Sequence, residues 1–157
     1  MAKESDRPNI SPIVHPPVVT LAFLLIVYAL GRFVPVPLTV PAMLRYIGLA
    51  FAFVGFLLGI GAFIEFMKAR TTLDPHGAAK QLVTSGIYRF TRNPIYLGFL
   101  LVLVGLPLYF GLYWGIVLAP LYVFLMNRLV IQHEEAYLER KFGKLYMDYT
   151  SQVRRWL

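Results

Sequence analysis

The sequence predicts an all-α protein that crosses a membrane several times. Hydrophobic residues make up 58% of the 157 residues, well above the roughly 45–50% of ordinary soluble domains. Charged residues make up only 15%, against about 25% in such domains. Apolar stretches long enough to cross the hydrocarbon core recur along the chain, separated by turn residues and polar connections. We therefore expect a polytopic membrane protein with about four transmembrane helices, forming a single domain over residues 1–157.

The first two spans are predicted at residues 18–34 and 44–67. The first carries no charge until Arg32, whose long side chain can snorkel to the interface, and it ends before Pro35. Because the connection to the second span is short, the two helices should run antiparallel. Residues 1–17 are polar and Pro-rich, and they lack the ordered regions of a signal peptide. We interpret this segment as a short cytoplasmic tail.

The second predicted span contains small residues and one acid. Gly48 and Gly55 suit close helix packing, because small residues let helix backbones approach each other in membranes. Glu65 lies near the polar end of the span and has two possible roles. It could form an ion pair with Lys68 three positions later, or it could face an active site at the membrane edge.

The longest polar connection is expected at residues 68–93. It carries five Lys or Arg residues against Asp74 alone, so the positive-inside rule places it in the cytoplasm. Basic residues in the segment 132–157 place that segment on the same side, and both termini are expected to be cytoplasmic, in the cell (inner) membrane. These loops account for the net charge of +7 better than nucleic-acid binding does, since no separate basic patch with interleaved aromatics exists. His76 is a lone loop histidine, and the sequence leaves open whether it takes part in function.

The third and fourth spans are predicted at residues 94–110 and 112–131. Pro107 and Gly111 mark the break between them. The linker is very short and uncharged, so the two helices should form a tight hairpin. Beyond the fourth span we expect one helix that leaves the membrane and forms a C-terminal cytoplasmic amphipathic segment within residues 132–157.

The sequence excludes several familiar kinds of site. It contains no Cys, which removes disulfides, thiol nucleophiles and thiolate metal sites. No G-x-G-x-x-G motif follows a strand, no P-loop is present, and no Cys/His cluster suits a metal. The serines have no evident His and Asp partners for a hydrolase triad. Metal-dependent and soluble nucleotide-binding chemistry are therefore not expected.

Polar groups instead converge at the predicted inner membrane face. They come from residues 86–98, from Arg128 and from residues 132–135. Ionisable groups at that depth are a functional hypothesis by default, because burying them in a membrane is costly. The alternative is that Glu134 and Glu135 only form ion pairs with Arg128 or Arg92.

Two blocks of the sequence resemble a known superfamily. Residues 92–98, RNPIYLG, resemble the R-(H/N)-P-x-Y-x-G signature of the isoprenylcysteine carboxyl methyltransferases and phospholipid methyltransferases. Residues 82–89, LVTSGIYR, are similar to the L-V-x-x-G-P-Y-R that precedes it. The C-terminal block begins at Glu134-Glu135, continues through Phe142-Gly143, Tyr146 and Tyr149, and ends at Val153-Arg154-Arg155. It resembles the superfamily's E-E…F-G-x-x-Y…Y…V-x-R.

The resemblance covers roughly residues 50–157 and has two departures. Asn93 stands where the carboxyl methyltransferases usually have His, and Ile87 stands where Pro is common. Because of both departures, the resemblance indicates a prenyl-protein substrate less strongly than it indicates a methyl-donor site.

The resemblance implies an integral membrane methyltransferase that uses S-adenosyl-L-methionine and acts at the cytoplasmic face. The acceptor would be lipophilic, a lipid amine, a prenylated thiol or a carboxylate, and no nucleic-acid partner is expected. The residues implied to bind the donor are Gly59, Gly61, Tyr88, Asn93, Pro94, Tyr96, Gly98, Glu134 and Glu135. For catalysis, Glu135 would act as base for an amine acceptor, and Arg92 or Arg154 would supply a cation for a carboxylate acceptor.

Two other functions stay open from the sequence. Some membrane sterol or polyprenol reductases that use NADPH share a similar C-terminal R-x-P-x-Y region, although they tend to be longer. A non-enzymatic membrane scaffold or small transporter would leave the two polar blocks without a ligand. Binding of S-adenosylhomocysteine compared with NADPH discriminates among the three.

Overall fold

The computed structural model describes residues 15–71 and 79–157. The elements in these ranges are α1 (Pro16–Phe33), α2 (Ala42–Lys68), the 3₁₀ helix η2 (Gly86–Arg89), α3 (Pro94–Tyr109), α4 (Trp114–Met126), the π-helical turn η3 (Asn127–Ile131), α5 (Gln132–Phe142) and α6 (Lys144–Gln152). Among the described residues, α1, α2 and the continuous helix from α4 through α5 are long and apolar enough to span a membrane, and α3 is a shorter apolar helix. The predicted all-α, polytopic fold is confirmed. The expectations for residues 1–14 and for His76 lie outside the described residues.

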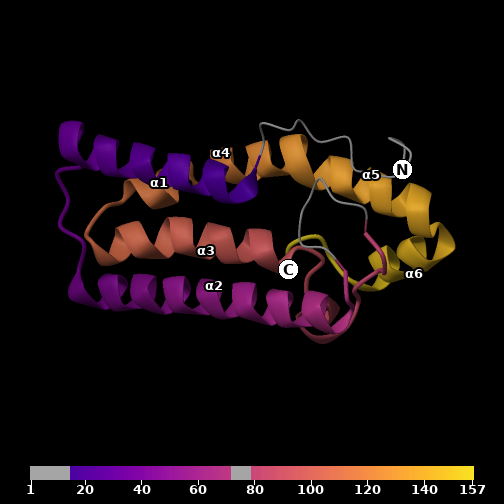
Figure 1. The fold of residues 1–157 in the computed structure, drawn as a ribbon. Coiled ribbons are helices and arrows are strands. Elements are labelled where there is room, and N and C mark those ends of the chain that lie inside the picture. Colours follow the sequence, from indigo (N-terminus) through magenta and orange to yellow (C-terminus); the bar gives the residue numbers. More distant parts are fainter. Residues whose placement is uncertain (1–14, 72–78) are drawn as a thin grey trace.

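Helix α3 occupies the centre of the bundle. Figure 1 shows α2 lying along one side of α3, with α1 and α4 on the other. Eight of the 16 residues of α3 are buried, compared with four of the 27 in α2. The remaining faces of α2 are apolar and exposed, as expected for a helix that faces lipid rather than a protein core.

Paired glycines bring α2 and α3 into backbone contact. A Cβ atom placed on Gly98 would lie 2.6 Å from the carbonyl oxygen of Gly55. One placed on Gly48 would lie 2.7 Å from the carbonyl oxygen of Gly105. No side chain fits at those distances, so the close-packing role predicted for Gly48 and Gly55 is confirmed.

The predicted hairpin between the third and fourth spans is also present. Helix α3 ends at Tyr109, and α4 begins at Trp114 after a turn in which Gly111 has a φ of +85°. Pro107 differs from expectation because it lies inside α3 and does not break the helix. A proline in the last turn removes one backbone hydrogen bond, which membrane helices tolerate.

A small polar contact fastens α1 to α4 within the apolar core. The hydroxyl groups of Thr20 and Tyr122 are 2.8 Å apart, and the ring of Phe23 meets the Tyr122 ring edge-on at 5.3 Å. Tyr122 is fully buried, so its hydroxyl needs the partner that Thr20 provides. This contact holds α1 over α4 and leaves α3 in the middle.

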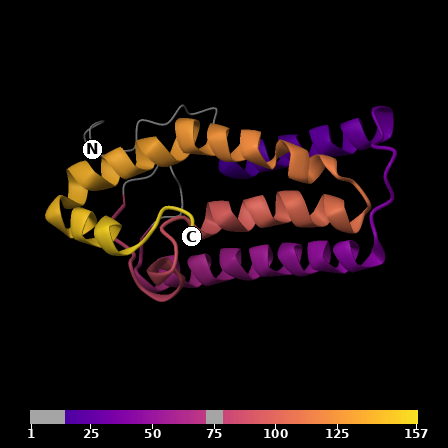
Figure 2. The same ribbon diagram turned by 180° about the vertical axis from the view of Figure 1, so that it is seen from behind.

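The C-terminal region departs from the single helix that the sequence predicts. A π-helical turn, η3, joins α4 to α5, and Gly143 separates α5 from α6 with a φ of +52°. Only glycine adopts that backbone conformation without strain, which is why the helix ends there. The chain then turns back, and Figures 1 and 2 both show the C-terminus beside the start of α3.

Candidate functional site

The two sequence blocks that carry the resemblance meet at the start of α3. The backbone N–H of Arg92 donates to the carbonyl of Arg154 at 3.0 Å. The side-chain amide of Asn93 donates to the carbonyl of Arg155 at 3.0 Å, and the hydroxyl of Thr91 donates to the same carbonyl at 3.3 Å. Thr91 and Asn93 are both buried. The C-terminal tail is therefore held against the segment that leads into α3.

An ion-pair cluster lies beside this junction. The Arg155 guanidinium donates from Nε and Nη2 to the two oxygens of Glu135, at 3.0 and 2.5 Å. Arg92 Nη1 lies 3.3 Å from Glu135 Oε1. The side chains of Arg92 and Glu135 are only 15% and 17% exposed, so each needs the other as a partner. Two cations share one carboxylate here, which leaves the cluster with an excess positive charge.

Arg92 retains unused hydrogen-bonding capacity in this cluster. Its Nε is buried, and no described residue accepts a hydrogen bond from it. A buried guanidinium nitrogen without a partner is costly, because it has lost its water and gained nothing in exchange. The group is suited to bind an anionic ligand such as a carboxylate.

Tyr96 and Glu134 form a second polar contact close to the first. The Tyr96 hydroxyl donates to Glu134 Oε1 at 2.7 Å, which links the first turn of α3 to the first turn of α5. Tyr96 is buried and Glu134 is half-buried. Glu134 and Glu135 are adjacent, so their carboxylates lie at the same level of the bundle. Their partners differ, because Glu134 accepts from Tyr96 whereas Glu135 pairs with Arg92 and Arg155.

Two tyrosines of α6, Tyr146 and Tyr149, lie beside the cluster with neutral hydroxyl groups. Burial raises the pKa of Tyr146 to about 12, with Glu135 raising it further and Arg92 opposing the change. Burial likewise raises the pKa of Tyr149, whose hydroxyl donates to the Tyr88 carbonyl at 2.7 Å. Hydrogen bonds to Glu135 raise the pKa of Arg155. At neutral pH the site therefore combines protonated tyrosines with permanently charged guanidinium groups.

Glu65 takes the first of its two predicted roles. Lys68 Nζ lies 2.8 Å from Glu65 Oε1, and the Ser85 hydroxyl donates to the other oxygen. Gly86, with a φ of +57°, lies against the same carboxylate, where a Cβ atom would overlap it. The ion pair at i+3 is confirmed, and Glu65 also anchors the loop that leads into η2.

The remaining predicted donor residues lie in three different settings. Pro94 is buried as the first residue of α3, where its missing N–H is not needed. Gly98 contacts the α2 backbone at Gly55. Gly59, by contrast, has no heavy atom within 4 Å of where its Cβ would be, and Gly61 has only Ile87, at 3.9 Å. The backbone of α2 is thus open at Gly59.

Two arginines that the sequence placed near the site point elsewhere. Arg154 is exposed, and its contribution to the junction is its carbonyl group. Arg128 is also exposed, and its guanidinium lies over the Phe124 ring at 5.8 Å. The proposed pairing of Glu134 or Glu135 with Arg128 is wrong, whereas the pairing of Glu135 with Arg92 is confirmed.

Sequence reasoning missed Arg155 as a site residue. The V-x-R spacing of the resemblance contained the signal, since an arginine two positions after Val153 is Arg155 and not Arg154. It also missed the contact from Trp156 Nε1 to Asn127 Oδ1, at 3.3 Å, which ties the tail to η3. No sequence pattern indicated that contact.

Two curated proteins illustrate what this chain is similar to. An uncharacterized protein of Haemophilus influenzae is 41% identical over 66 residues, which are 40% of this chain and all of that protein. A protein-S-isoprenylcysteine O-methyltransferase of Schizosaccharomyces pombe is 36% identical over 72 residues. That match covers 46% of this chain and 30% of the yeast protein. No solved structure matches the chain significantly.

The sequence pattern of one family extends over most of the bundle and over part of the site. It matches residues 44–145, from the start of α2 to the beginning of α6. This range contains the segment at the start of α3 and the two site carboxylates of α5, Glu134 and Glu135. Since it covers well over half of the 157 residues, the chain belongs to the phospholipid methyltransferase family.

Proposed function

We propose that this protein is an integral membrane methyltransferase that transfers a methyl group from S-adenosyl-L-methionine to a lipophilic acceptor at the cytoplasmic membrane face. The observation that carries the proposal is the junction of the two polar blocks at one end of an apolar bundle. Arg92, Asn93 and Tyr96 come from one block, and Glu134, Glu135 and Arg155 come from the other. Family membership supports methyl transfer as the reaction.

The side chains present fit the polar parts of this donor. Arg92 has a buried Nε without a partner and suits a carboxylate, such as that of the methionine moiety. Glu134 can accept hydrogen bonds from an ammonium group or from ribose hydroxyls, and Tyr96 fixes its orientation. The open backbone at Gly59 admits a flat or extended group against α2. When bound, the donor supplies a methyl group activated by its sulfonium charge.

The ion-pair cluster gives Glu135 a positioning role in this proposal. Both of its oxygens accept hydrogen bonds or ion pairs from arginines, so an acceptor amine would compete with Arg155 for them. Glu135 instead holds Arg92 beside the site. Glu134 is the carboxylate with fewer partners, and we assign to it any removal of a proton from an amine acceptor. A carboxylate acceptor would need no base and would use the excess positive charge of the cluster.

A groove on the lipid-facing side supports a lipophilic acceptor. It has a volume of about 560 Å³ and lies where α2, α3 and α4 meet. Its lining is apolar and includes Phe51, Leu100, Leu101, Val104, Ile116 and Phe124. Leu100 is one helical turn beyond Tyr96, so the inner end of the groove lies close to the polar site. A hydrocarbon chain in this groove would bring its headgroup toward Tyr96 and Glu134.

The length of α3 favours entry from the bilayer. Sixteen residues span about 24 Å, shorter than the roughly 30 Å of a hydrocarbon core. The polar site at the start of α3 is therefore close to the level of the inner-leaflet chains. A lipid could present its headgroup without leaving the membrane, while the polar donor arrives from the cytoplasm.

Calorimetry of the purified full-length protein in detergent tests the proposal. We expect S-adenosylhomocysteine to bind and NADPH not to bind. Binding of NADPH alone would identify a reductase instead, and binding of neither would favour a protein without enzymatic function. Glu134→Gln should weaken S-adenosylhomocysteine binding, whereas Glu139→Gln, an exposed acid on the same helix, should leave it unchanged.

A further inference from the structure

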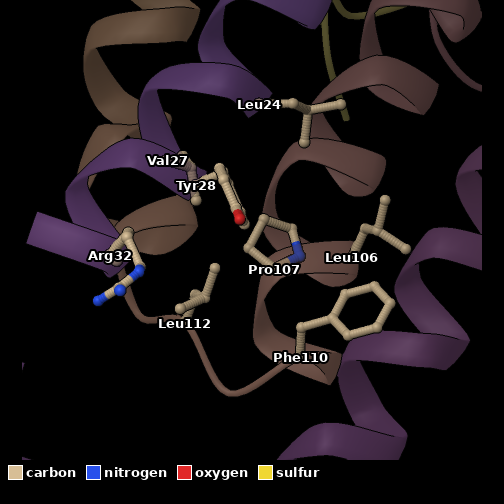
Figure 3. Close-up of a pocket in the computed structure, with 9 residues that line it drawn as sticks. Leu24, Val27, Tyr28, Arg32, Leu106, Pro107, Phe110 and Leu112 are labelled. Carbon is tan, nitrogen blue, oxygen red and sulfur yellow. The ribbon is translucent and has the colours of Figure 1, made fainter. Parts of the chain in front are cut away.

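A second cavity lies at the opposite end of the bundle from the candidate active site. It is a groove of about 490 Å³ between the last two turns of α1 and the end of α3 (Figure 3). The residues that form its apolar wall include Leu24, Tyr28, Leu106, Pro107, Phe110 and Leu112. Figure 3 shows the α1 side chains on one side of the groove and the α3 side chains on the other. Nothing in the proposed methyl transfer uses it.

Arg32 is the one charged residue in the wall of this groove. It lies in the last turn of α1, and its guanidinium can reach the headgroup region at the end of the span. The groove extends from there toward Leu24, along about 12 Å of helix axis at 1.5 Å per residue. A cation at headgroup depth above an apolar groove matches the layout of a phospholipid, with its phosphate above its chains.

The chain offers Arg32 no carboxylate partner at this end. The sequence has no Asp or Glu between residues 7 and 64 or between residues 75 and 133. The acids that the structure describes all lie toward the other end, namely Glu65, Glu134, Glu135, Glu139 and Asp148. A counter-ion for Arg32 at this face must therefore come from outside the described protein.

Arg45, the other arginine at this end, is occupied by the fold. Its Nε donates to the Val40 carbonyl at 3.3 Å, and its guanidinium lies beneath Gly111 in the hairpin turn. Arg45 thus stabilises the connections between helices, and Arg32 has no such task among the described contacts. This difference separates an arginine with a structural role from one that is available to a ligand.

We propose that this groove binds one acyl chain of an anionic phospholipid whose phosphate pairs with Arg32. A guanidinium binds phosphate oxygens through two parallel N–H groups, which fixes the headgroup at the mouth of the groove. The wall accepts the chain, because it is formed mainly by aliphatic and aromatic side chains, with the Tyr28 hydroxyl and the Arg32 guanidinium as its polar side-chain groups. A zwitterionic lipid carries its own cation beside the phosphate, so it gains less from Arg32 than an anionic lipid does.

Native mass spectrometry of the delipidated full-length protein tests this site. The probes are dioleoyl phosphatidylglycerol, dioleoyl phosphatidylcholine and inorganic phosphate. We expect one phosphatidylglycerol to bind at least about tenfold more tightly than phosphatidylcholine, and inorganic phosphate to bind too weakly to detect. Arg32→Gln should remove the preference for phosphatidylglycerol. Leu106→Trp, which fills the groove, should weaken binding of both lipids.

Arg45→Gln is the matched control, because it removes the same charge at the same end and Arg45 does not line the groove. It should keep the preference for phosphatidylglycerol. Equal losses in Arg32→Gln and Arg45→Gln would overturn the proposal in favour of general surface charge. A dimer mass that Leu106→Trp abolishes would show that a second copy of the chain fills the groove. Unchanged S-adenosylhomocysteine binding in all three variants would show that they are folded. If Leu106→Trp does not fold, the comparison of Arg32→Gln with Arg45→Gln decides the question.

Discussion

The side-chain amide of Asn93 donates to the carbonyl of Arg155 at 3.0 Å, although 62 positions separate the two residues. Through this bond the segment before α3 holds the C-terminal tail in place. The tail in turn presents the Arg155 guanidinium to Glu135. Asn93 is therefore placed to organise the charged cluster without carrying charge itself.

Replacing Asn93 with alanine should loosen this junction. The Arg155 carbonyl would keep only the longer bond from Thr91, at 3.3 Å. A lost buried hydrogen bond costs about 0.5–1.5 kcal/mol, so thermal unfolding in detergent should occur at a lower temperature. S-adenosylhomocysteine affinity should also fall, because Arg155 would hold Glu135 and Arg92 less firmly.

Asn93→His is the informative partner of that variant. Histidine can donate from a ring N–H where asparagine donates from its amide. It is also the usual residue at this position in the carboxyl methyltransferases that the motif resembles. We expect Asn93→His to retain more stability than Asn93→Ala. A histidine variant as unstable as the alanine variant would show that the Asn93 amide is not acting as a hydrogen-bond donor.

The contact between Tyr96 and Glu134 gives a prediction for donor binding. Tyr96→Phe keeps the ring and removes the hydroxyl that donates to Glu134 at 2.7 Å. A hydrogen bond to a charged group contributes about 1.5–3 kcal/mol, so its loss should lower the stability of the protein. S-adenosylhomocysteine titrations should also show weaker binding, because the hydroxyl no longer holds Glu134 in place for the donor. Tyr122→Phe, which removes a buried hydroxyl in the α1–α4 contact, should cost stability and leave donor affinity as in wild type.

The apolar spans and the glycine contacts were predictable because they depend on local composition. Hydrocarbon solvent requires long apolar helices, and backbone contact requires glycine, so both leave a mark in the sequence. The site was only partly predictable, because its contacts do not depend on local composition alone. Both polar blocks were recognisable, but the partner of each side chain depends on how the tail returns to α3.

Arg154 and Arg155 show where such prediction stops. The segment after α6 is extended at Val153, with φ of −122° and ψ of 128°. Successive side chains of an extended segment point to opposite sides. Val153 is buried, Arg154 is exposed, and Arg155 meets Glu135. Adjacent arginines thus have opposite surroundings, and only the backbone conformation tells them apart.

The helix register after α4 also could not be read from spacing alone. The π-helical turn η3 takes up an additional residue, so side chains before and after it no longer share one face as in a regular α-helix. Arg128 lies in this turn and packs on Phe124, whereas Glu135 faces the bundle. In an unbroken α-helix, Arg128 and Glu135 would share one stripe, because they are seven positions apart, and the π-helical turn removes this alignment.

Two glycines of the same predicted site should respond oppositely to alanine. A Cβ on Gly98 would lie 2.6 Å from the Gly55 carbonyl, so Gly98→Ala must push α2 and α3 apart, at a cost of about 1–3 kcal/mol. Gly59 has open space, and Gly59→Ala should hold or raise the unfolding temperature, because alanine favours a helix by about 1 kcal/mol over glycine. Gly59→Ala should instead weaken S-adenosylhomocysteine binding. Unchanged affinity would remove Gly59 from the donor site.

The chain contains no Cys, so single cysteines can report which side of the membrane each loop occupies. Leu38 and Lys80 are both exposed, in connections at opposite ends of the bundle. If both termini are cytoplasmic, an impermeant maleimide should label Leu38→Cys in intact cells and should label Lys80→Cys only after permeabilisation. The reverse pattern would place the candidate site outside the cell and would contradict donor entry from the cytoplasm.

The groove between α2, α3 and α4 predicts how the acceptor binds. Val104→Trp places a large ring in that groove, whereas Val117→Trp adds the same ring at an exposed position that the groove does not include. Each buried CH₂ of an acceptor chain contributes about 0.8 kcal/mol, so displacing three or four of them should raise KM for a lipid acceptor by roughly a hundredfold. Methyl transfer from labelled donor into a lipid extract measures this effect. S-adenosylhomocysteine affinity should stay unchanged in both variants. Label that appears only in water-soluble products would exclude the lipophilic acceptor and leave the donor site in place.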